Sequence, residues 1–259
     1  MEKIRIMFSR KVVLGSLPRL TIVDHNETYG RHILEKIAKT NKFHKCVDIG
    51  CGGGTDLMTI KKYNPNAELI GIDYGSWNSD KLSQQNIIPL SVNIERENMP
   101  FEDGSVDIFI ANQILEHTKE IFWINHEIFI CLKNGGYLFI GVPNILSFHN
   151  RLLMLFGFHP TQHRLVSSHV RPFSKVDVFD FYGGIGNSFC KIEGFWGSQF
   201  YPFPKMPARI LSTLFPSLAF SIFFLIRKTD NYIDDFSTWP DKQLHETNFY
   251  KGANQKNKK

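Results

Sequence analysis

Cysteine is scarce in this chain. Among 259 residues there are only four, scattered at Cys46, Cys51, Cys131 and Cys190. Their spacing matches no metal-binding pair, and two of them fall in a predicted buried strand or a glycine-rich loop. These observations argue against a disulfide scaffold and predict a reduced, cytoplasmic protein.

Long apolar runs are also missing. The longest apolar stretch, residues 208–226, is interrupted by Ser212, Thr213, Pro216, Ser217 and Ser221. A run broken so often is a poor transmembrane helix. The basic N-terminal segment has neither a long apolar run nor a cleavage pattern, so we expect no signal peptide.

Charge is modest, with a net value of +5, and 42% of the residues are hydrophobic. Such a charge gives no strong case for nucleic-acid binding. The hydrophobic fraction is enough for a full core, and the length favours one domain with appendages.

Glycine, in contrast, is concentrated in one stretch, residues 45–56 (KCVDIGCGGGTD), where four glycines occupy five positions. Residues 46–49 before them predict a short buried strand. Thr55 or Asp56 after them can cap a helix that runs to about residue 62. Glycines between a strand and a helix let the backbone turn sharply and approach a ligand closely.

The spacing of these glycines narrows the class of ligand. A dinucleotide site requires Gly-x-Gly-x-x-Gly, and Thr55 stands at the third glycine position. The phosphate-binding pattern Gly-x4-Gly-Lys-Ser/Thr is absent. Asp48 lies two residues before the first glycine, where a carboxylate suits an ammonium group and repels a pyrophosphate. The pattern therefore disfavours NAD, with an ordinary tight turn as the structural alternative.

A second carboxylate, Asp73, ends the predicted strand 68–72, about 20 residues beyond the glycines. One carboxylate can accept hydrogen bonds from both hydroxyls of a ribose. Because NAD and other nucleoside cofactors all present a ribose, Asp73 does not separate them. It does argue against a purely structural loop.

Several segments together resemble the class I S-adenosylmethionine-dependent methyltransferases. VDIGCGGG at residues 47–54 is similar to motif I of that family. Residues 93–112 (NIERENMPFEDGSVDIFIAN), 114–117 (ILEH) and 132–144 (LKNGGYLFIGVPN) resemble its later motifs. The resemblance covers roughly residues 29–144, with the motifs in the family's order and spacing.

The resemblance implies a Rossmann-like α/β fold. Its sheet has seven mostly parallel strands with an antiparallel last strand, and helices on both faces. We expect an N-terminal extension at residues 1–28, the methyltransferase domain at 29–228 with a cap at about 145–172, and a C-terminal tail at 229–259. Residues 1–24 are compatible with a strand or a surface segment.

The resemblance also implies S-adenosylmethionine as the cofactor. Asn93 stands where the family has aspartate, and its oxygen can still accept from the adenine amino group. Tyr29 and Arg31 occupy positions over the methionine end, or alternatively form a packed tyrosine and a solvated arginine. The implied cofactor-binding set is Tyr29, Arg31, Asp48, Gly50, Cys51, Gly52, Gly54, Asp73, Tyr74, Asn93, Ile94, Ala111 and Asn112.

His117, in the segment ILEH, is the candidate catalytic residue. It follows the predicted fourth strand, at the end of the sheet where ligands collect in open α/β folds. Its pKa range suits a general base. The alternative is a histidine that packs or caps the next helix. Methyl transfer depends mainly on alignment of the two reactants, so the absence of a base would not exclude activity.

Acceptor-binding residues are expected after residue 145. Residues 145–158 predict an apolar helix, and a loop with several histidines follows. Those histidines have no dependable metal spacing, so we expect no metal site. Residues 169–174 (HVRPFS) resemble a segment of methyltransferases in glycan and lipid biosynthesis, which implies that His169 and Arg171 bind a polar or anionic part of the substrate.

Residues 205–215 predict an amphipathic helix, with Met206, Ile210 and Leu214 on its apolar face. The simpler interpretation is a helix that covers the sheet, and the alternative is contact with a membrane surface or a lipid-linked substrate.

The sequence therefore predicts O-methylation of a sugar, glycan or lipid-linked intermediate, in the cytoplasm or at the inner face of the membrane. No nucleic-acid partner is expected. The alternatives are a quinone or other small aromatic acceptor, and a non-catalytic module that binds S-adenosylmethionine.

Overall fold

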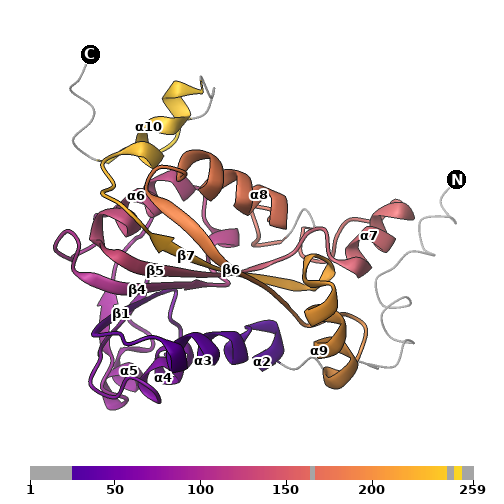
Figure 1. Ribbon diagram of the computed structural model, residues 1–259, viewed down its shortest axis with the longest axis horizontal. Coiled ribbons are helices and arrows are strands. Elements are labelled where there is room, and N and C mark those ends of the chain that lie inside the picture. Colours follow the sequence, from indigo (N-terminus) through magenta and orange to yellow (C-terminus); the bar gives the residue numbers. More distant parts are fainter. Residues whose placement is uncertain (1–24, 164–166, 244–247, 253–259) are drawn as a thin grey trace, which may run out of the picture.

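The computed structural model describes residues 25–163, 167–243 and 248–252. Its centre is a seven-stranded sheet in the order β3-β2-β1-β4-β5-β7-β6 (Figure 1). The strands are β1 (Lys45–Ile49), β2 (Glu68–Asp73), β3 (Ile88–Ser91), β4 (Val106–Asn112), β5 (Leu132–Pro143), β6 (Cys190–Ser198) and β7 (Ser221–Lys228). The first five strands pair in parallel, and β7 is antiparallel to both of its neighbours. The predicted fold class is confirmed. The predictions for residues 1–24 lie outside the described residues.

Helices cover both faces of the sheet (Figure 1). One face packs against α3 (Arg31–Thr40), α4 (Thr55–Lys61) and α5 (Ser79–Gln84). The other face packs against α6 (Ile121–Cys131), α8 (Lys175–Asp180) and α10 (Asp235–Lys242). The central strands are buried on both sides, which explains why β1, β4 and the second half of β5 read as nearly continuous apolar runs rather than alternating ones.

Helix α3 forms because its apolar residues recur on one face, and that face is buried at Ile33, Leu34, Ile37 and Ala38. Gly30, immediately before it, has φ of 56°, and a Cβ there would lie 2.5 Å from the ring of Phe223. Only glycine fits this position, so the sequence fixes both the face of α3 and its close approach to β7.

Residues after β7 contribute to the core. The ring of Phe129 in α6 lies 5.8 Å from the ring of Tyr232 and 5.3 Å from that of Phe236 in α10. Phe236 is fully buried. The stretch expected to be a tail therefore supplies aromatic side chains that complete the α6 face of the sheet, while its last described residues, 248–252, lie beside α6 through contacts such as Phe122 with Phe249.

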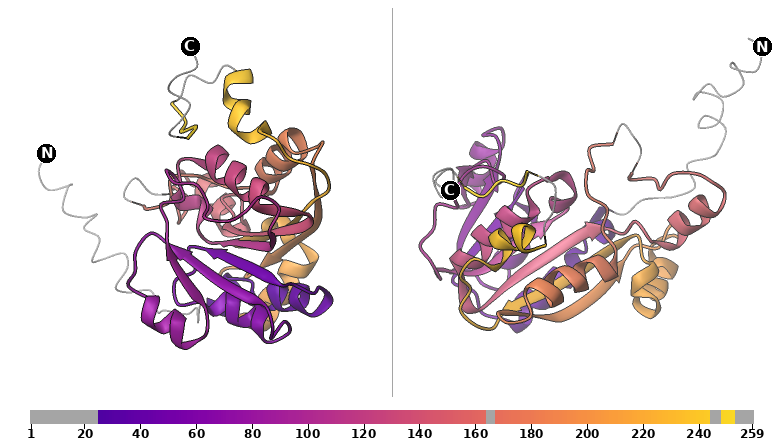
Figure 2. Two further views of the ribbon diagram at one scale, coloured as in Figure 1. Left: turned by 90° about the vertical axis from the view of Figure 1, so that its left-hand side faces the viewer. Right: turned by 90° about the horizontal axis from the view of Figure 1, so that it is seen from above.

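Residues 145–172, the expected cap, leave the sheet and return to it at one point. Asn144 at the end of β5 bridges Phe173, and the amide of Ile145 donates to the carbonyl of Phe173 at 2.9 Å. The buried Asn144 side chain donates to the carbonyls of Ser217 and Ala219, each at 2.9 Å. We call this junction the neck. Helix α7 (Phe148–Leu155) lies beyond it (Figures 1 and 2).

Two glycine pairs lie inside regular elements, although glycine commonly ends a helix. Gly135 and Gly136 lie within β5, which begins directly after α6. Gly183 and Gly184 lie in the turn of π-helix Phe181–Ile185 that continues α8. The start of α8 is specified locally, because Ser174 caps it through a reciprocal capping box with Asp177.

Helix α9 (Lys205–Leu214) does not cover the sheet with its apolar face. Its buried residues are Ala208 and Ser212, whereas Met206, Ile210 and Leu214 are 59–69% exposed. The small side chains allow the helix to pack closely against β6, and the large ones point outward. The interpretation of these apolar residues as core is thus corrected. No helix in the described ranges combines the length and apolar character needed to cross a membrane.

The Lys228 ammonium group stabilises the junction between α6 and β5. It is buried and donates to the carbonyls of Phe129 at 2.6 Å and Leu132 at 2.8 Å. We expect Lys228→Met to lower the free energy of unfolding by about 2–3 kcal/mol, because two buried carbonyls lose a charged donor. Urea denaturation measures this. The exposed Lys191→Met should change it by less than about 0.5 kcal/mol; equal effects would contradict the assignment.

Candidate functional site

A cavity of about 190 Å³ lies at the carboxyl ends of the central strands. The chain order of the sheet reverses between β1 and β4, and ligands of open α/β folds bind at such a point. Of the residues predicted to bind a cofactor or act in catalysis, six line this cavity: Gly50, Asp73, Tyr74, Asn93, Ile94 and His117. These residues come from four separate segments of the sequence.

The glycine loop needs its glycines for two different reasons. A Cβ on Gly50 would lie 2.8 Å from the Ile114 side chain, and a Cβ on Gly54 would lie 2.7 Å from Ile87. These two permit close packing. A Cβ on Gly52 would meet nothing within 4 Å, but its φ of 48° is in the left-handed region. Gly52 therefore gives the loop its turn and leaves space in front of it.

Asp73 ends β2 at the wall of the cavity. Its Oδ1 accepts from the amide of Tyr74 at 2.8 Å, and its Oδ2 accepts from the amide of Gly52 at 3.3 Å. Each carboxylate oxygen can accept a further hydrogen bond. The two amides thus hold the carboxylate in place and leave it able to bind a pair of hydroxyl groups. Tyr74 is 71% exposed at the rim.

Asn93 and Ile94 form the opposite wall. The Asn93 Oδ1 accepts from the amide of Glu95 at 3.1 Å, which makes a local turn, and its second lone pair is available to a ligand. Glu95 also lines the cavity and accepts from the amides of Lys119 and Glu120. No local pattern marks Glu95 as a site residue, because its partners lie in a distant segment.

Three carboxylates gather behind the glycine loop. Burial raises the pKa of Asp48 well above its usual range. Repulsion from Asp56 and then from Asp73 adds to this effect, and Arg31 opposes it. Asp48 therefore lies near two further acids, Asp56 and Asp73, and one guanidinium, that of Arg31. Such an excess of negative potential favours a ligand that carries positive charge.

Asp56 connects this group to the rest of the site. It is buried and accepts from Arg31 Nε at 3.0 Å and from Asn112 Nδ2 at 2.7 Å. Asn112 Nδ2 also donates to the carbonyl of Tyr29 at 2.9 Å. The predicted residues Tyr29, Arg31 and Asn112 are therefore joined through a carboxylate that the sequence suggested only as a helix cap.

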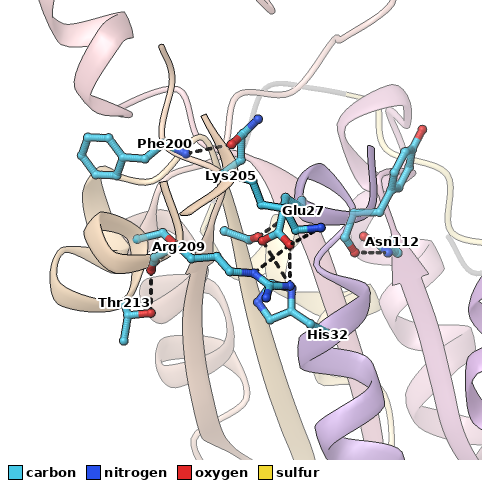
Figure 3. A network of polar contacts seen from close by, with 11 residues as sticks. Glu27, His32, Asn112, Phe200, Lys205, Arg209 and Thr213 are labelled. Atoms are coloured by element: carbon cyan, nitrogen blue, oxygen red, sulfur yellow. Dashed lines mark hydrogen bonds and ion pairs between the residues drawn. The ribbon is translucent and has the colours of Figure 1, made fainter. Parts of the chain in front are cut away.

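Glu27 anchors the same segment on its other side (Figure 3). It is buried in the short helix α2 (His25–Thr28), and its Oε1 accepts from Arg209 Nε at 2.8 Å. Lys205 lies 3.8 Å from the same oxygen, and His32 Nδ1 lies 3.7 Å from Oε2. Figure 3 shows these side chains pointing from α9 and α3 towards Glu27. Helix α9 thus holds the chain that carries Tyr29 and Arg31.

Other predicted residues do not present side chains to the cavity. Ala111 is buried in β4, so any contact with a ligand would come from its main chain. The Cys51 side chain packs against Gly71, where an added Cβ would lie 2.6 Å from its Sγ. Burial raises the pKa of Cys51 to about 12, so it stays a neutral thiol.

His117 belongs to a turn of 3-10 helix, η1 (Leu115–His117), that lies against residues 168–171. The carbonyl of Glu116 accepts from the amides of Val170 at 2.8 Å and Arg171 at 3.1 Å. The Arg171 guanidinium donates to the carbonyls of Thr118 and Lys119. Arg171 therefore fastens this loop to η1, and its predicted contact with a substrate stays a prediction.

At this contact the Glu116 side chain is buried, His169 is half-buried and His117 is exposed. His117 and His169 meet edge to face with ring centroids 4.6 Å apart. Burial, followed by the influence of His117 and His163, lowers the pKa of His169 to about 4. Burial raises the pKa of Glu116 to about 8. The structure thus brings together His117, predicted to be catalytic, and His169, predicted to bind substrate. Glu116, which no sequence pattern marked, lies beside them.

We expect Asn112→Ala to destabilise the protein by about 2 kcal/mol, because the Asp56 carboxylate and the Tyr29 carbonyl both lose a buried donor. Chemical denaturation measures the change. Asn134→Ala serves as the control, since Asn134 forms only an exposed hydrogen bond with Asn231, and it should have an effect below about 0.5 kcal/mol. An equally mild effect of both variants would show that the Asn112 bonds are dispensable.

Comparison with known families gives a match over the part of the chain that carries the glycine loop and Asp73. Residues 47–140 match a family model described as a methyltransferase domain. An uncharacterised methyltransferase of Schizosaccharomyces pombe is 27% identical over 132 residues, which cover 47% of this chain and 46% of that protein. The ubiquinone biosynthesis O-methyltransferase of Pelagibacter ubique is 27% identical over 126 residues, 44% and 52% of the respective chains. The chain spans about half or less of the length of the curated relatives it matches.

Solved structures agree on the fold. A methyltransferase of Burkholderia thailandensis, solved with 1,6-didemethyltoxoflavin and S-adenosylhomocysteine, superimposes with a TM-score of 0.54 at 12% identity, and the match covers 80% of each chain. A SAM-dependent methyltransferase from Aquifex aeolicus gives a TM-score of 0.52 at 13% identity, with 82% of this chain and 96% of that one covered. At these identities the likeness concerns the fold.

Proposed function

We propose that this chain, which carries a methyltransferase domain of the S-adenosylmethionine-dependent class, transfers a methyl group from S-adenosylmethionine to an oxygen of a sugar, glycan or lipid-linked intermediate. The observation that carries the proposal is the cavity that combines the Asp73 carboxylate, Asn93 and His117. One end of it suits a nucleoside, and the other holds a basic side chain.

The residues present fit this cofactor. The Asp73 oxygens accept the two ribose hydroxyls, and Asn93 and Ile94 contact the adenine. The methionine end lies towards Asp48, Asp56 and Arg31. Asp48 and Asp56 there suit the positive charge of the ammonium and sulfonium groups, and the charge of Arg31 is offset by its ion pair with Asp56 at 3.0 Å. When bound, the cofactor supplies an electrophilic methyl group on sulfur.

His117 is the residue we assign to acceptor activation. Its Nδ1 lies 3.2 Å from the carbonyl of Ser168, and a carbonyl can only accept, so Nδ1 carries the proton. In the neutral ring Nε2 then keeps its lone pair. The side chain lines the cavity, which puts a proton acceptor beside the position of the reacting groups.

Two features support an acceptor with an apolar part. A second cavity of about 280 Å³, lined mostly by apolar side chains, lies on the other side of η1 and includes Leu115, Phe122 and Arg171. Helices α7 and α9 project beyond the same end of the sheet (Figures 1 and 2) with large apolar side chains exposed: Leu152, Leu155, Phe156, Met206, Ile210 and Leu214. We also propose that the enzyme works in the cytoplasm against a membrane surface.

Other acceptors fit the domain class as well. Matched relatives carry names for methylation of ubiquinone intermediates, sterols and ribosomal RNA. A small aromatic acceptor is the main alternative, and the apolar cavity beside η1 favours it. A non-catalytic module would bind the cofactor and methylate none of these acceptors, so an acceptor screen with radiolabelled cofactor separates it from an enzyme.

Cofactor binding should depend on Asp73. We expect saturable calorimetric binding of S-adenosylhomocysteine, and no comparable binding of NAD. Asp73→Ala should weaken the affinity at least about tenfold, because the ribose loses two hydrogen bonds. Asp80→Ala, on the exposed part of α5, is the matched control and should bind like the wild type. Preference for NAD, or an unaffected Asp73→Ala variant, would reject the proposed cofactor site.

Membrane contact should depend on the outer face of α9. We expect the triple variant Met206→Ser/Ile210→Ser/Leu214→Ser to bind vesicles of anionic phospholipid at least about tenfold more weakly in a sedimentation assay, because apolar contact with the bilayer is lost. Ile233→Ser removes a side chain that is 77% exposed near α10 and is the control. Equal binding of all three proteins would contradict the membrane assignment.

A further inference from the structure

Glu116, His117 and His169 form a cluster in which each residue can offer one metal-ligand atom, and these atoms all lie within 4.8 Å of one another. The residue types are two imidazoles and one carboxylate. Three ligands of this kind, with other coordination positions left open, are typical of catalytic metal centres.

The chain holds this cluster together through its main chain. The amides of Val170 and Arg171 donate to the carbonyl of Glu116, which places His169 directly beside η1. The Arg171 side chain binds the carbonyls that follow η1. The side chains of the cluster therefore do not need to attract one another in order to meet.

The cluster contains buried polar atoms that have no hydrogen-bond partner among the described residues, and a bound cation would provide one. Glu116 is only 1% exposed, and its Oε2 has no hydrogen-bond partner within the described ranges. The same is true of His169 Nδ1. Buried polar atoms without partners are destabilising, and a bound ion would satisfy both of them.

The side chains of the cluster do not hydrogen-bond to one another. His117 Nε2 lies 3.9 Å from Glu116 Oε1, which is beyond hydrogen-bond distance. His117 Nδ1 is already engaged with the carbonyl of Ser168. A histidine that donates one ring N–H to a backbone carbonyl presents its other nitrogen in the orientation that a metal requires.

We propose that Glu116, His117 and His169 bind a divalent transition-metal ion of the Zn²⁺ type. Two imidazoles favour such an ion over Mg²⁺, which prefers oxygen ligands and retains water. This proposal departs from the expectation of no metal site, which followed from residue spacing, because spacing along the chain brings only Glu116 and His117 together. His169 joins them through the loop that the fold returns to η1.

The role of this ion rests on the proposed function and replaces the direct proton transfer there: His117, as a ligand through Nε2, activates the acceptor through the ion and does not itself take the proton. A cation at the cluster takes an acceptor hydroxyl as a further ligand and lowers the pKa of that hydroxyl. The hydroxyl proton leaves to solvent, and the oxygen forms a bond to the methyl carbon. The carbon–sulfur bond breaks with its electron pair left on sulfur, so no oxidant or reductant is needed.

Zinc binding tests the site directly. The untagged full chain is stripped with a chelator and dialysed against Zn²⁺ in the presence of a chromophoric competitor. We expect one tightly bound equivalent. Glu116→Gln and His169→Gln should each weaken it by about 100-fold or more, since removing a ligand exceeds the effect of removing an outer partner. His159→Gln, an exposed histidine outside the cluster, is the matched control and should bind like the wild type.

S-adenosylhomocysteine binding is measured for each variant. Binding shows that the variant is folded, and it separates the proposed metal site from the proposed methyltransferase function. Folded variants that keep the tight Zn²⁺ equivalent, or a wild type without one, would overturn the metal site and leave the proposed function intact. A wild type that binds Zn²⁺ through the cluster but not S-adenosylhomocysteine would retain the metal site and overturn the methyltransferase proposal.

Discussion

The hydrogen bonds that Asn112 donates to Asp56 and to the carbonyl of Tyr29 fix the relative positions of three elements at the carboxyl end of the sheet. They join the last residue of β4 to the start of α4 and to the turn before α3. Each of these elements is also anchored elsewhere in the fold, and this amide connects all three. The space for a cofactor depends on that connection, since the glycine loop lies between the same elements.

The positions of the predicted cofactor residues follow from local signals, and their contact with a cofactor stays a prediction. A glycine loop after a buried strand and an acidic residue at the tip of the next strand are adjacent to the structure that places them, and both stand where expected. The apolar face of α3 is likewise evident from the sequence, because helical periodicity and burial coincide at Ile33, Leu34 and Ile37.

The remaining parts depend on contacts between distant segments. Glu27 pairs with Arg209 across most of the chain, and Glu116 meets His169 only after the loop returns to η1. No local pattern encodes either pair. The amphipathic pattern of α9 specifies a helix with an apolar side, but it does not specify whether that side faces the sheet or solvent. Small residues at Ala208 and Ser212 decide the question.

The neck between Asn144 and Phe173 has an evolutionary consequence. Because the excursion leaves and re-enters the sheet at a single bridged pair, insertions, deletions or recombination within it leave the strand registers unchanged. His169 lies inside the excursion, whereas Glu116 and His117 lie outside it, in η1. Replacement of this one segment during divergence would exchange the acceptor-facing surface and one member of the cluster in the same event, while the cofactor side is inherited unchanged.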